Sequence, residues 1–307
     1  MNLTDSHGRR INYLRLSVTD RCNMRCSYCM PATGVKKLDH GDMLSYEELL
    51  RVADEAVSLG IRKIRVTGGE PLVRKGLAGF LERLSRLPDL RELVLTTNGL
   101  LLEEMAAPLR RAGVQRLNIS LDSLRPDTFT RITRGAELKR VLAGIAAAEK
   151  AGFPPVKINM VVMRGVNDAE ILDFAALTLE KPWTVRFIEY MPATREEGWE
   201  RLAVSGAHIL ERIGTRFPLL PAVCAEMAGP ARNFRIGGAR GTIGIITPVS
   251  GHFCDSCNRI RVTAAGLARG CLFAGHGVDL KPLLRGEDDG ALRQALAGVI
   301  LGKPGRH

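Results

Sequence analysis

The sequence predicts an α/β protein built on an open, partial (β/α)6 barrel of the TIM-like kind. Six short runs rich in apolar residues alternate with segments of helical apolar spacing. Strands that alternate with helices pair in parallel through right-handed crossovers. Six such units are too few for a closed eight-stranded barrel, so we expect the sheet to stay open. The unusual residues follow the strands directly, at the end where such barrels carry their chemistry.

The strands and helices of the barrel occupy the first 190 residues in regular alternation. We expect strands at residues 13–18, 63–67, 93–97, 116–121, 156–163 and 184–190. Ser45 and Glu48 have the spacing of a capping box, which predicts that a helix begins there and ends at Gly60. Further helices are expected at residues 77–87, up to Arg111, at 137–151 and at 168–179.

The pattern changes after residue 192. A helix is expected near residues 207–213, followed by a Pro/Ala/Gly-rich passage at 217–229 and by strand-like runs at 234–236 and 243–247. We therefore divide the chain into a barrel, residues 1–200, and a smaller C-terminal α+β extension, residues 201–307.

Composition favours a small anionic ligand over nucleic acid or a membrane. The formal charge is +11 at pH 7, but basic residues are spread along the 307-residue chain and aromatic residues make up only 5%. No run of eighteen apolar residues and no signal-type N-terminus is present, so we expect a cytoplasmic protein. In a reducing cytosol, grouped cysteines are more often metal ligands than disulfides.

The first cysteine group is Cys22, Cys26 and Cys29, in C-x3-C-x2-C spacing directly after the first predicted strand. Three thiolates from one loop can hold three irons of a [4Fe–4S] cluster and leave the fourth iron open. A zinc knuckle is the alternative, but a fourth Cys or His does not follow within ten residues. The spacing, with an aromatic Tyr28, resembles that of the radical S-adenosylmethionine (SAM) superfamily, in which the open iron binds SAM.

The second cysteine group is Cys254, Cys257 and Cys271, in C-x2-C-x13-C spacing. A zinc ribbon would need a second close pair, so zinc would have to recruit His252 or His276. A second three-thiolate [4Fe–4S] cluster, with an open iron for substrate, fits the spacing better. Cys224 is interpreted as an ordinary thiol, and His7, His40, His208 and His307 have no metal-binding spacing.

Seven segments together resemble the GTP 3′,8-cyclase family of radical SAM enzymes, which begins molybdopterin (molybdenum cofactor) biosynthesis. They are RLSVTDRC (15–22), IRVTGGEPL (64–72), TTNG (96–99), SLDSL (120–124), KIN (157–159), RFIEYMP (186–192) and HFCDSCNRIRVT (252–263). The resemblance extends over about residues 9–307. It implies a partial barrel of radical SAM type whose C-terminal extension carries a second Fe–S site.

The resemblance also implies roles for single residues. The SAM contacts would be Tyr28, Gly69, Ser120 and Met191. The GTP contacts would be Arg15, Arg65, Thr96, Lys157, Arg259 and Arg261, with Lys63 and Arg186 as additions, and Arg259 and Arg261 would also serve catalysis. The two cysteine groups would each hold a [4Fe–4S] cluster, and the open iron of the second would bind the guanine edge.

The implied reaction is conversion of GTP to 3′,8-cyclo-7,8-dihydro-GTP, a radical cyclisation by a lyase. A deoxyadenosyl radical from SAM would take the hydrogen at C3′, and the carbon radical would attack C8 of guanine. The implied partners are GTP, an electron donor and the next enzyme of the molybdopterin pathway, and a homodimer stays open. Nucleic acid and membrane are not expected.

Residue chemistry supports the same site independently of the family. Arg15, Lys63, Arg65, Lys157 and Arg186 lie in otherwise apolar strands, where a charge is costly unless it is paired. Arginine suits a polyphosphate because its planar fork binds two oxygens at once. Structural ion pairs are the alternative, and Glu70 could be a buried partner of these cations.

Two rival functions remain open from the sequence. One is another twin-cluster radical SAM enzyme that acts on a peptide, although such enzymes usually have more C-terminal cysteines. The other is a non-catalytic, zinc-bearing protein that binds nucleic acid. Relatives usually continue beyond a KPxxH segment, here residues 303–307, to a tail ending in Gly-Gly. We expect the chain as given to bind GTP but to cyclise it poorly without such a tail.

Overall fold

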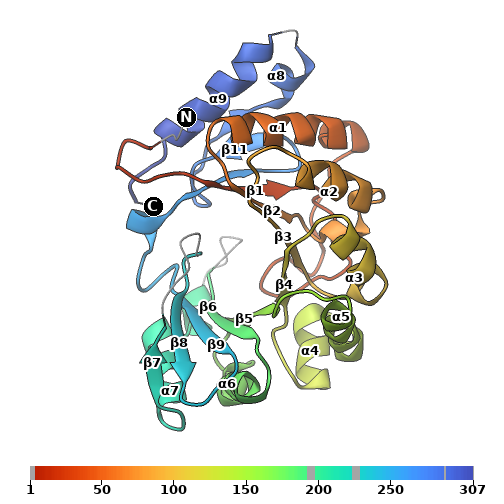
Figure 1. Cartoon of the computed structure of the whole chain (residues 1–307). Helices are drawn as coiled ribbons and strands as arrows, with labels where there is room; N and C mark the ends of the chain where they lie inside the picture. Colours follow the sequence, from red (N-terminus) through yellow and green to blue (C-terminus); the bar gives the residue numbers. More distant parts are fainter. Residues whose placement is uncertain (1–3, 192–197, 223–228, 287, 307) are drawn as a thin grey trace.

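The described residues form one curved, open sheet of twelve strands. The structure is a computed structural model that describes residues 4–191, 198–222, 229–286 and 288–306. Its sheet runs in the order β12-β11-β10-β1-β2-β3-β4-β5-β6-β9-β8-β7, and Figure 1 shows its two ends on opposite sides of the opening. The sheet does not close, which confirms the predicted open barrel.

The central six strands are parallel neighbours in chain order, as predicted. They are β1 (Tyr13–Ser17), β2 (Lys63–Thr67), β3 (Glu92–Thr97), β4 (Arg116–Ser120), β5 (Lys157–Val162) and β6 (Thr184–Glu189). The observed ends differ from the predicted ends by at most one residue. Parallel neighbours need a crossover, and the intervening helices supply it.

The crossover helices cover the outer side of the sheet (Figure 1). They are α1 (Tyr46–Ser58), α2 (Leu77–Ser85), α3 (Leu102–Arg111), α4 (Pro126–Thr133), α5 (Leu138–Lys150) and α6 (Ile171–Glu180). The predicted capping box is present, because Ser45 Oγ accepts a bond from the Glu48 amide at 3.0 Å and the Glu48 carboxylate accepts from the Ser45 amide at 2.7 Å. The helix α4 was not predicted from the sequence.

The C-terminal part of the chain extends the same sheet at both edges. At one edge, β9 (Thr242–Ile246) pairs in parallel with β6, and β8 (Arg232–Ile236) and β7 (Leu219–Pro221) follow antiparallel. At the other, β10 (Arg259–Val262) pairs in parallel with β1. The strands β11 (Leu267–Arg269) and β12 (Val278–Asp279) continue this edge. The boundary at residue 200 stays a prediction.

The remaining helices belong mainly to this C-terminal part. They are α7 (Gly206–Gly214), α8 (Lys281–Arg285) and α9 (Asp289–Leu301), of which only the first was predicted. Short 3-10 turns occur at His40–Asp42, Pro71–Val73, Asp168–Glu170, Trp199–Arg201 and Cys254–Ser256. In the part of the chain that the structure describes, no helix combines the length and the apolar character needed to cross a membrane.

The alternation of side chains along β1 separates the core from the site. Leu14 and Leu16 are fully buried in the apolar core between sheet and helices. Tyr13 and Arg15 point to the opposite face, where they line a cavity. The concave side of the sheet is therefore polar and cationic, and it is the place where a ligand fits.

Candidate active site

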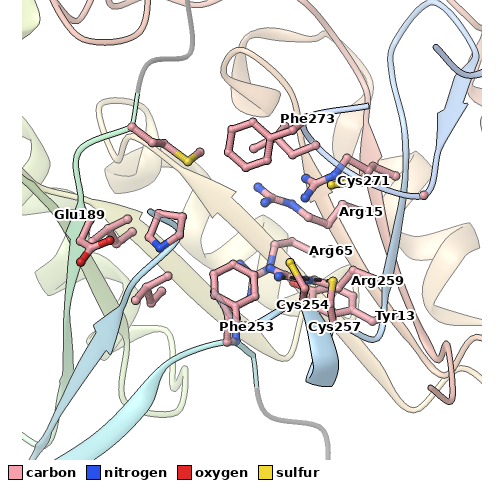
Figure 2. A pocket seen from close by; sticks show the side chains of 18 of the residues that line it. Tyr13, Arg15, Arg65, Glu189, Phe253, Cys254, Cys257, Arg259, Cys271 and Phe273 are labelled. Atoms are coloured by element: carbon pink, nitrogen blue, oxygen red, sulfur yellow. Dashed lines mark hydrogen bonds between the residues drawn. The ribbon is translucent and has the colours of Figure 1, made fainter. Parts of the chain in front are cut away.

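A cavity of about 310 Å³ lies on the concave side of the sheet, lined by Cys29 of the first cysteine group and by all three cysteines of the second, which Figure 2 labels. Twelve of the predicted site residues line it: Arg15, Tyr28, Cys29, Arg65, Thr96, Arg186, Met191, Cys254, Cys257, Arg259, Arg261 and Cys271. Six others do not: Cys22, Cys26, Lys63, Gly69, Ser120 and Lys157. The lining therefore joins residues that are more than 200 positions apart in the sequence.

The first cysteine loop is fixed by the loop that follows β2. The Gly69 amide donates to the Thr19 carbonyl at 2.7 Å, and the Glu70 amide donates to the Arg21 carbonyl at 2.8 Å. A Cβ atom on Gly69 would lie 2.4 Å from the Arg21 carbonyl oxygen, so this close approach requires glycine. Gly69 thus acts on the cysteine loop through its backbone.

The Glu70 side chain joins the loop after β2 to the end of β3. Its carboxylate accepts bonds from the Leu72 amide at 3.0 Å, the Thr97 hydroxyl at 2.8 Å and the Asn98 amide at 2.6 Å. Burial raises the pKa of Glu70 to about 7, although these bonds oppose the rise. The sequence-based idea that Glu70 is a partner of the strand cations is wrong, because these backbone and hydroxyl donors hold its carboxylate instead.

The three sulfurs of the first group lie in one another's electrostatic field. Cys22 Sγ accepts bonds from the Met24 amide at 3.4 Å and from Asn98 Nδ2 at 3.8 Å. Burial raises the pKa of Cys22, Cys26 and Cys29, and negative charge on neighbouring residues raises it further. Cys22 and Cys26 are half-buried and Cys29 is exposed, and three neighbouring thiols from one loop are the donor set that a [4Fe–4S] cluster with one open iron requires.

Tyr28 is held in place beside this loop by Asp122. The Tyr28 hydroxyl donates to Asp122 Oδ2 at 2.8 Å, and Asp122 Oδ1 accepts from the Val161 amide at 2.8 Å. Burial raises the pKa of Asp122 to about 6 and raises that of Tyr28 as well. The pair fixes the aromatic ring that precedes Cys29 at the cavity wall.

Three arginines stand in a row across neighbouring strands. Arg15 on β1 is in register with Arg65 on β2 and with Arg261 on β10. Burial lowers the pKa of Arg15 to about 9, and the neighbouring Arg65 lowers it too. Burial and the neighbouring Arg259 lower that of Arg261 to about 10. Like charges this close favour an anionic ligand between them.

The one carboxylate among the described residues lining the cavity is already engaged. Glu189 lies across the cavity from Arg15 (Figure 2) and accepts bonds from the amides of Gly206, Val249 and Ser250 at 2.6, 3.1 and 2.9 Å. It therefore joins the start of helix α7 to the loop at Val249 and Ser250. Sequence reasoning did not single out Glu189, although it is part of the RFIEYMP segment.

Several buried polar atoms on the cavity wall have no hydrogen-bond partner. They are the Nε atoms of Arg65, Arg186 and Arg261, Thr96 Oγ1 and Asn159 Oδ1. An unsatisfied buried polar atom costs about 1–3 kcal/mol, so a polar ligand would offset a real cost here. Asn159 was not predicted, although it stands in the KIN segment two residues after Lys157.

The second cysteine group lies on the cavity wall beside Arg259. One guanidinium nitrogen of Arg259 is 3.7 Å from Cys257 Sγ, and the guanidinium stacks 4.9 Å from the centre of the Phe253 ring. Ile260 turns to the opposite, fully buried side, so Arg259 and Arg261 share the face that lines the cavity. Burial alone would raise the pKa of Cys257, but Arg259 and Lys303 outweigh it and lower the pKa to about 7.

Two residues near this group were missed from the sequence. Arg9 was not singled out at all, and Lys303 appeared only as part of the segment at residues 303–307, yet both line the cavity. Cys224, the lone thiol, lies outside the described residues, as does His307.

Two of the predicted GTP contacts open onto a second cavity of about 550 Å³ at the beginning of the strands. Lys63 and Lys157 line it, and Arg186 lines both cavities. Lys63 Nζ is 2.5 Å from Glu92 Oε2, so this cation does have a structural ion pair. Burial lowers the pKa of Lys157 to about 7, with Arg186 and Lys63 adding to the effect.

Comparison with solved structures agrees with this fold. A crystal structure of SuiB from Streptococcus suis bound to S-adenosylmethionine matches with a TM-score of 0.68 over 96% of this chain and 69% of that one. The two sequences are 13% identical, so the likeness concerns the fold alone.

Comparison with sequences is more specific. The model of the radical SAM superfamily matches residues 16–178, and that of Molybdenum Cofactor Synthesis C matches residues 183–307. A GTP 3′,8-cyclase of Geobacter sulfurreducens is 66% identical over all of this chain and 94% of its own. One from Pelotomaculum thermopropionicum is 47% identical over 99% of this chain and 95% of its own. The cavity between two cysteine groups thus sits in a member of the GTP 3′,8-cyclase family, within the radical SAM superfamily, to which this chain belongs.

Proposed function

We propose that this chain converts GTP to 3′,8-cyclo-7,8-dihydro-GTP, the first step of molybdopterin biosynthesis. The observation that carries the proposal is the single cavity bounded by Cys29 on one side and by Cys254, Cys257 and Cys271 on the other, with unpaired arginine nitrogens between them. A radical source and an anionic substrate fit one such space. The high identity to GTP 3′,8-cyclases supports this substrate.

The first cysteine group and its surroundings would hold a [4Fe–4S] cluster and SAM. When bound, these supply the 5′-deoxyadenosyl radical by reductive cleavage. Cys22, Cys26 and Cys29 are the proposed ligands. Tyr28 and Met191 line the cavity near SAM's proposed place, while Gly69 and Ser120 would contribute through backbone or hydroxyl contacts.

The arginine row would bind and orient GTP. Arg15, Arg65 and Thr96 offer donors to phosphate or ribose oxygens, because all three line the cavity and the buried atoms Arg65 Nε and Thr96 Oγ1 have no partner there. Lys63, Lys157 and Arg186 would extend this cationic surface towards the second cavity. Such fixed donors hold C3′ and C8 of the nucleotide in a reactive arrangement and exclude water from it.

The second group would hold another [4Fe–4S] cluster with an open iron for the guanine edge. Cys254, Cys257 and Cys271 are the proposed ligands, and Arg259 and Arg261 would hold the nucleotide next to them. Support comes from the geometry, because all three cysteines line one cavity together with Arg259, one guanidinium nitrogen of which is 3.7 Å from Cys257 Sγ.

Reconstitution under anaerobic conditions tests the proposal. Incubation with SAM, dithionite and GTP should yield 5′-deoxyadenosine and a cyclised nucleotide, and the protein should carry about eight iron per chain. Replacing Cys254, Cys257 and Cys271 by Ala should halve the iron and leave some SAM cleavage. Zinc without iron would overturn the proposal, and a modified peptide but no modified GTP would favour the rival peptide-modifying function.

The cellular setting belongs to the same proposal. We place the protein in the cytoplasm, where it would receive electrons from a donor protein and pass its product to the next enzyme of the molybdopterin pathway. A homodimer is compatible with this setting. The division into residues 1–200 and 201–307 is kept as a proposal, in which the second part supplies the second cysteine group.

A further inference from the structure

Arg9 forms a closed unit with Asp5 near the start of the chain. Arg9 Nε donates to Asp5 Oδ2 at 2.6 Å, and Asp5 Oδ1 accepts from the Arg9 amide at 2.9 Å. Both residues are buried, at 8% and 5% exposure. A buried pair with several hydrogen bonds holds the guanidinium in one orientation, so the remaining donors point in a fixed direction.

Those remaining donors reach two separate segments of the chain. Arg9 Nη1 donates to the Cys254 carbonyl at 2.7 Å and to the Gly305 carbonyl at 3.2 Å. Nη2 donates to the carbonyls of Pro304 at 2.8 Å and Lys303 at 3.3 Å. One side chain therefore ties the C-terminal segment to the loop that carries the first two cysteines of the second group.

Lys303 makes the complementary link to the third cysteine. Its ammonium donates to the Gly270 carbonyl at 2.6 Å, directly before Cys271, and its positive charge acts on the nearby Cys257 thiol, whose pKa it helps to lower. Lys303 is 3% exposed, and a Cβ atom on Gly270 would lie 3.2 Å from the Lys303 Cα atom. The C-terminal segment is thus packed closely against both parts of the second cysteine group.

We propose that Arg9 and Lys303 are positioning residues of the second cysteine group. The β10–β11 hairpin pairs Arg261 with Arg269 and so brings the segment of Cys254 and Cys257 to the same end as Cys271, but all three cysteines lie beyond the paired residues. Arg9 holds one part, Lys303 holds the other, and residues 303–305 join the two. This inference rests on the second cluster of the proposed function.

Lys303 should also set the reduction potential of that cluster. Reduction adds negative charge, and a buried ammonium beside a ligand sulfur stabilises the more negative form. Removing the ammonium should therefore make reduction harder, whereas removing Arg9 should mainly loosen the ligand spacing. The two residues are thereby distinguishable by experiment.

The experiment uses the full chain with Cys22, Cys26 and Cys29 replaced by Ala, so that only the second cluster remains. Lys303→Met should lower the equilibrium constant for reduction of the cluster at least tenfold. For a one-electron couple this is a shift of the reduction potential by about 59 mV to more negative values, which EPR-monitored titration measures. Lys303→Arg keeps the positive charge and should therefore have a reduction potential close to that of the parent variant. Arg9→Met should lose at least half of the bound iron during gel filtration. Arg293→Met, an exposed residue of α9, is the matched control.

The outcomes separate this inference from the proposed function. No iron in the parent variant would overturn both. Iron present, with potential and iron retention in Lys303→Met and Arg9→Met equal to those of Arg293→Met, would overturn only the positioning role. Should Lys303→Met fail to fold by circular dichroism, Lys303→Gln removes the charge, keeps a donor for the Gly270 carbonyl and carries the same potential measurement.

Discussion

Arg15 and Arg261 are register partners on the neighbouring parallel strands β1 and β10, so their guanidinium groups stand side by side on the concave face of the sheet. Both are half-buried, and this partial burial, followed by the neighbouring arginines, lowers the pKa of each. Two neighbouring like charges that are partly removed from water destabilise the ligand-free protein. An anion bound between the two guanidinium groups would offset their repulsion. The two arginines therefore lower the stability of the ligand-free protein and raise its affinity for an anion.

Arg15→Met should separate these two effects. The ligand-free variant should unfold at higher urea concentration, with a free energy of unfolding about 1–2 kcal/mol above that of the wild type, because a partly buried, unpaired charge is removed. Its GTP affinity, measured by calorimetry, should fall by about 1.5–3 kcal/mol, the value of a charge-assisted hydrogen bond. Arg240→Met, at an exposed position, is the control. A less stable variant with unchanged GTP affinity would contradict the assigned role.

The lowered pKa of Lys157 predicts that the difference in stability between Lys157→Met and the wild type depends on pH. Burial lowers its pKa to about 7 from the usual 10.5, so between these values the unfolded chain binds a proton that the folded chain has lost. Stability from this residue therefore rises as pH increases through that window and is lowest below it. Lys157→Met should be more stable than wild type at about pH 6, and the advantage should shrink towards pH 9.

Urea unfolding of the ligand-free protein at several pH values measures this difference. Lys139→Met, whose side chain is 83% exposed, is the control and should show no trend. An advantage of Lys157→Met that is independent of pH would mean that the ammonium is not buried as described.

Gly69→Ala should disconnect the two loops that build the first cysteine site. The new Cβ would lie 2.4 Å from the Arg21 carbonyl, and overpacking of this kind costs about 1–3 kcal/mol. We expect the reconstituted variant to lose iron from the first site, seen as about four instead of eight iron per chain, with SAM cleavage abolished. Gly79→Ala, in α2 with nothing near the new atom, should retain both clusters. Full iron content in Gly69→Ala would show that the loops have room to separate.

The sequence predicted the barrel because local signals fix it. Apolar alternation placed each of the six central strands to within one residue at either end, and the Ser45 capping box placed the start of α1. The shared face of Arg259 and Arg261 also follows from local alternation. The positions of β9 and β10 in the sheet do not follow from local alternation, because β9 pairs with β6 and β10 pairs with β1, and no local pattern connects such distant segments.

Arg9 and Lys303 could not be predicted from the sequence, also because no local pattern reveals their contacts. Arg9 and Lys303 act by donating to main-chain carbonyls, and such contacts leave no motif in the sequence. The separation of Lys63 and Lys157 from the main cavity had a visible signal, because each is the first residue of its strand. Arg65 and Asn159, two residues further along, lie higher on the same face and reach the cavity.

Substitutions of Arg259 can separate the contribution of its planar shape from the contribution of its charge. Its guanidinium stacks on Phe253 at 4.9 Å while one nitrogen lies 3.7 Å from Cys257 Sγ. The compact ammonium of lysine cannot do both, because it lacks the planar fork. Arg259→Lys should therefore recover only part of the loss caused by Arg259→Ala, which we expect at about 1.5–3 kcal/mol in kcat/KM for GTP.

SAM cleavage without GTP is the second measurement for these variants, and it should stay near wild type because Arg259 lies beside the second cysteine group. Arg235→Lys, at an exposed position on β8, controls for the general effect of the exchange. Wild-type turnover in Arg259→Lys would show that charge alone is enough at this position. Wild-type turnover in Arg259→Ala as well would show that Arg259 has no role in the reaction, because alanine can replace neither the stacked guanidinium nor its charge beside Cys257.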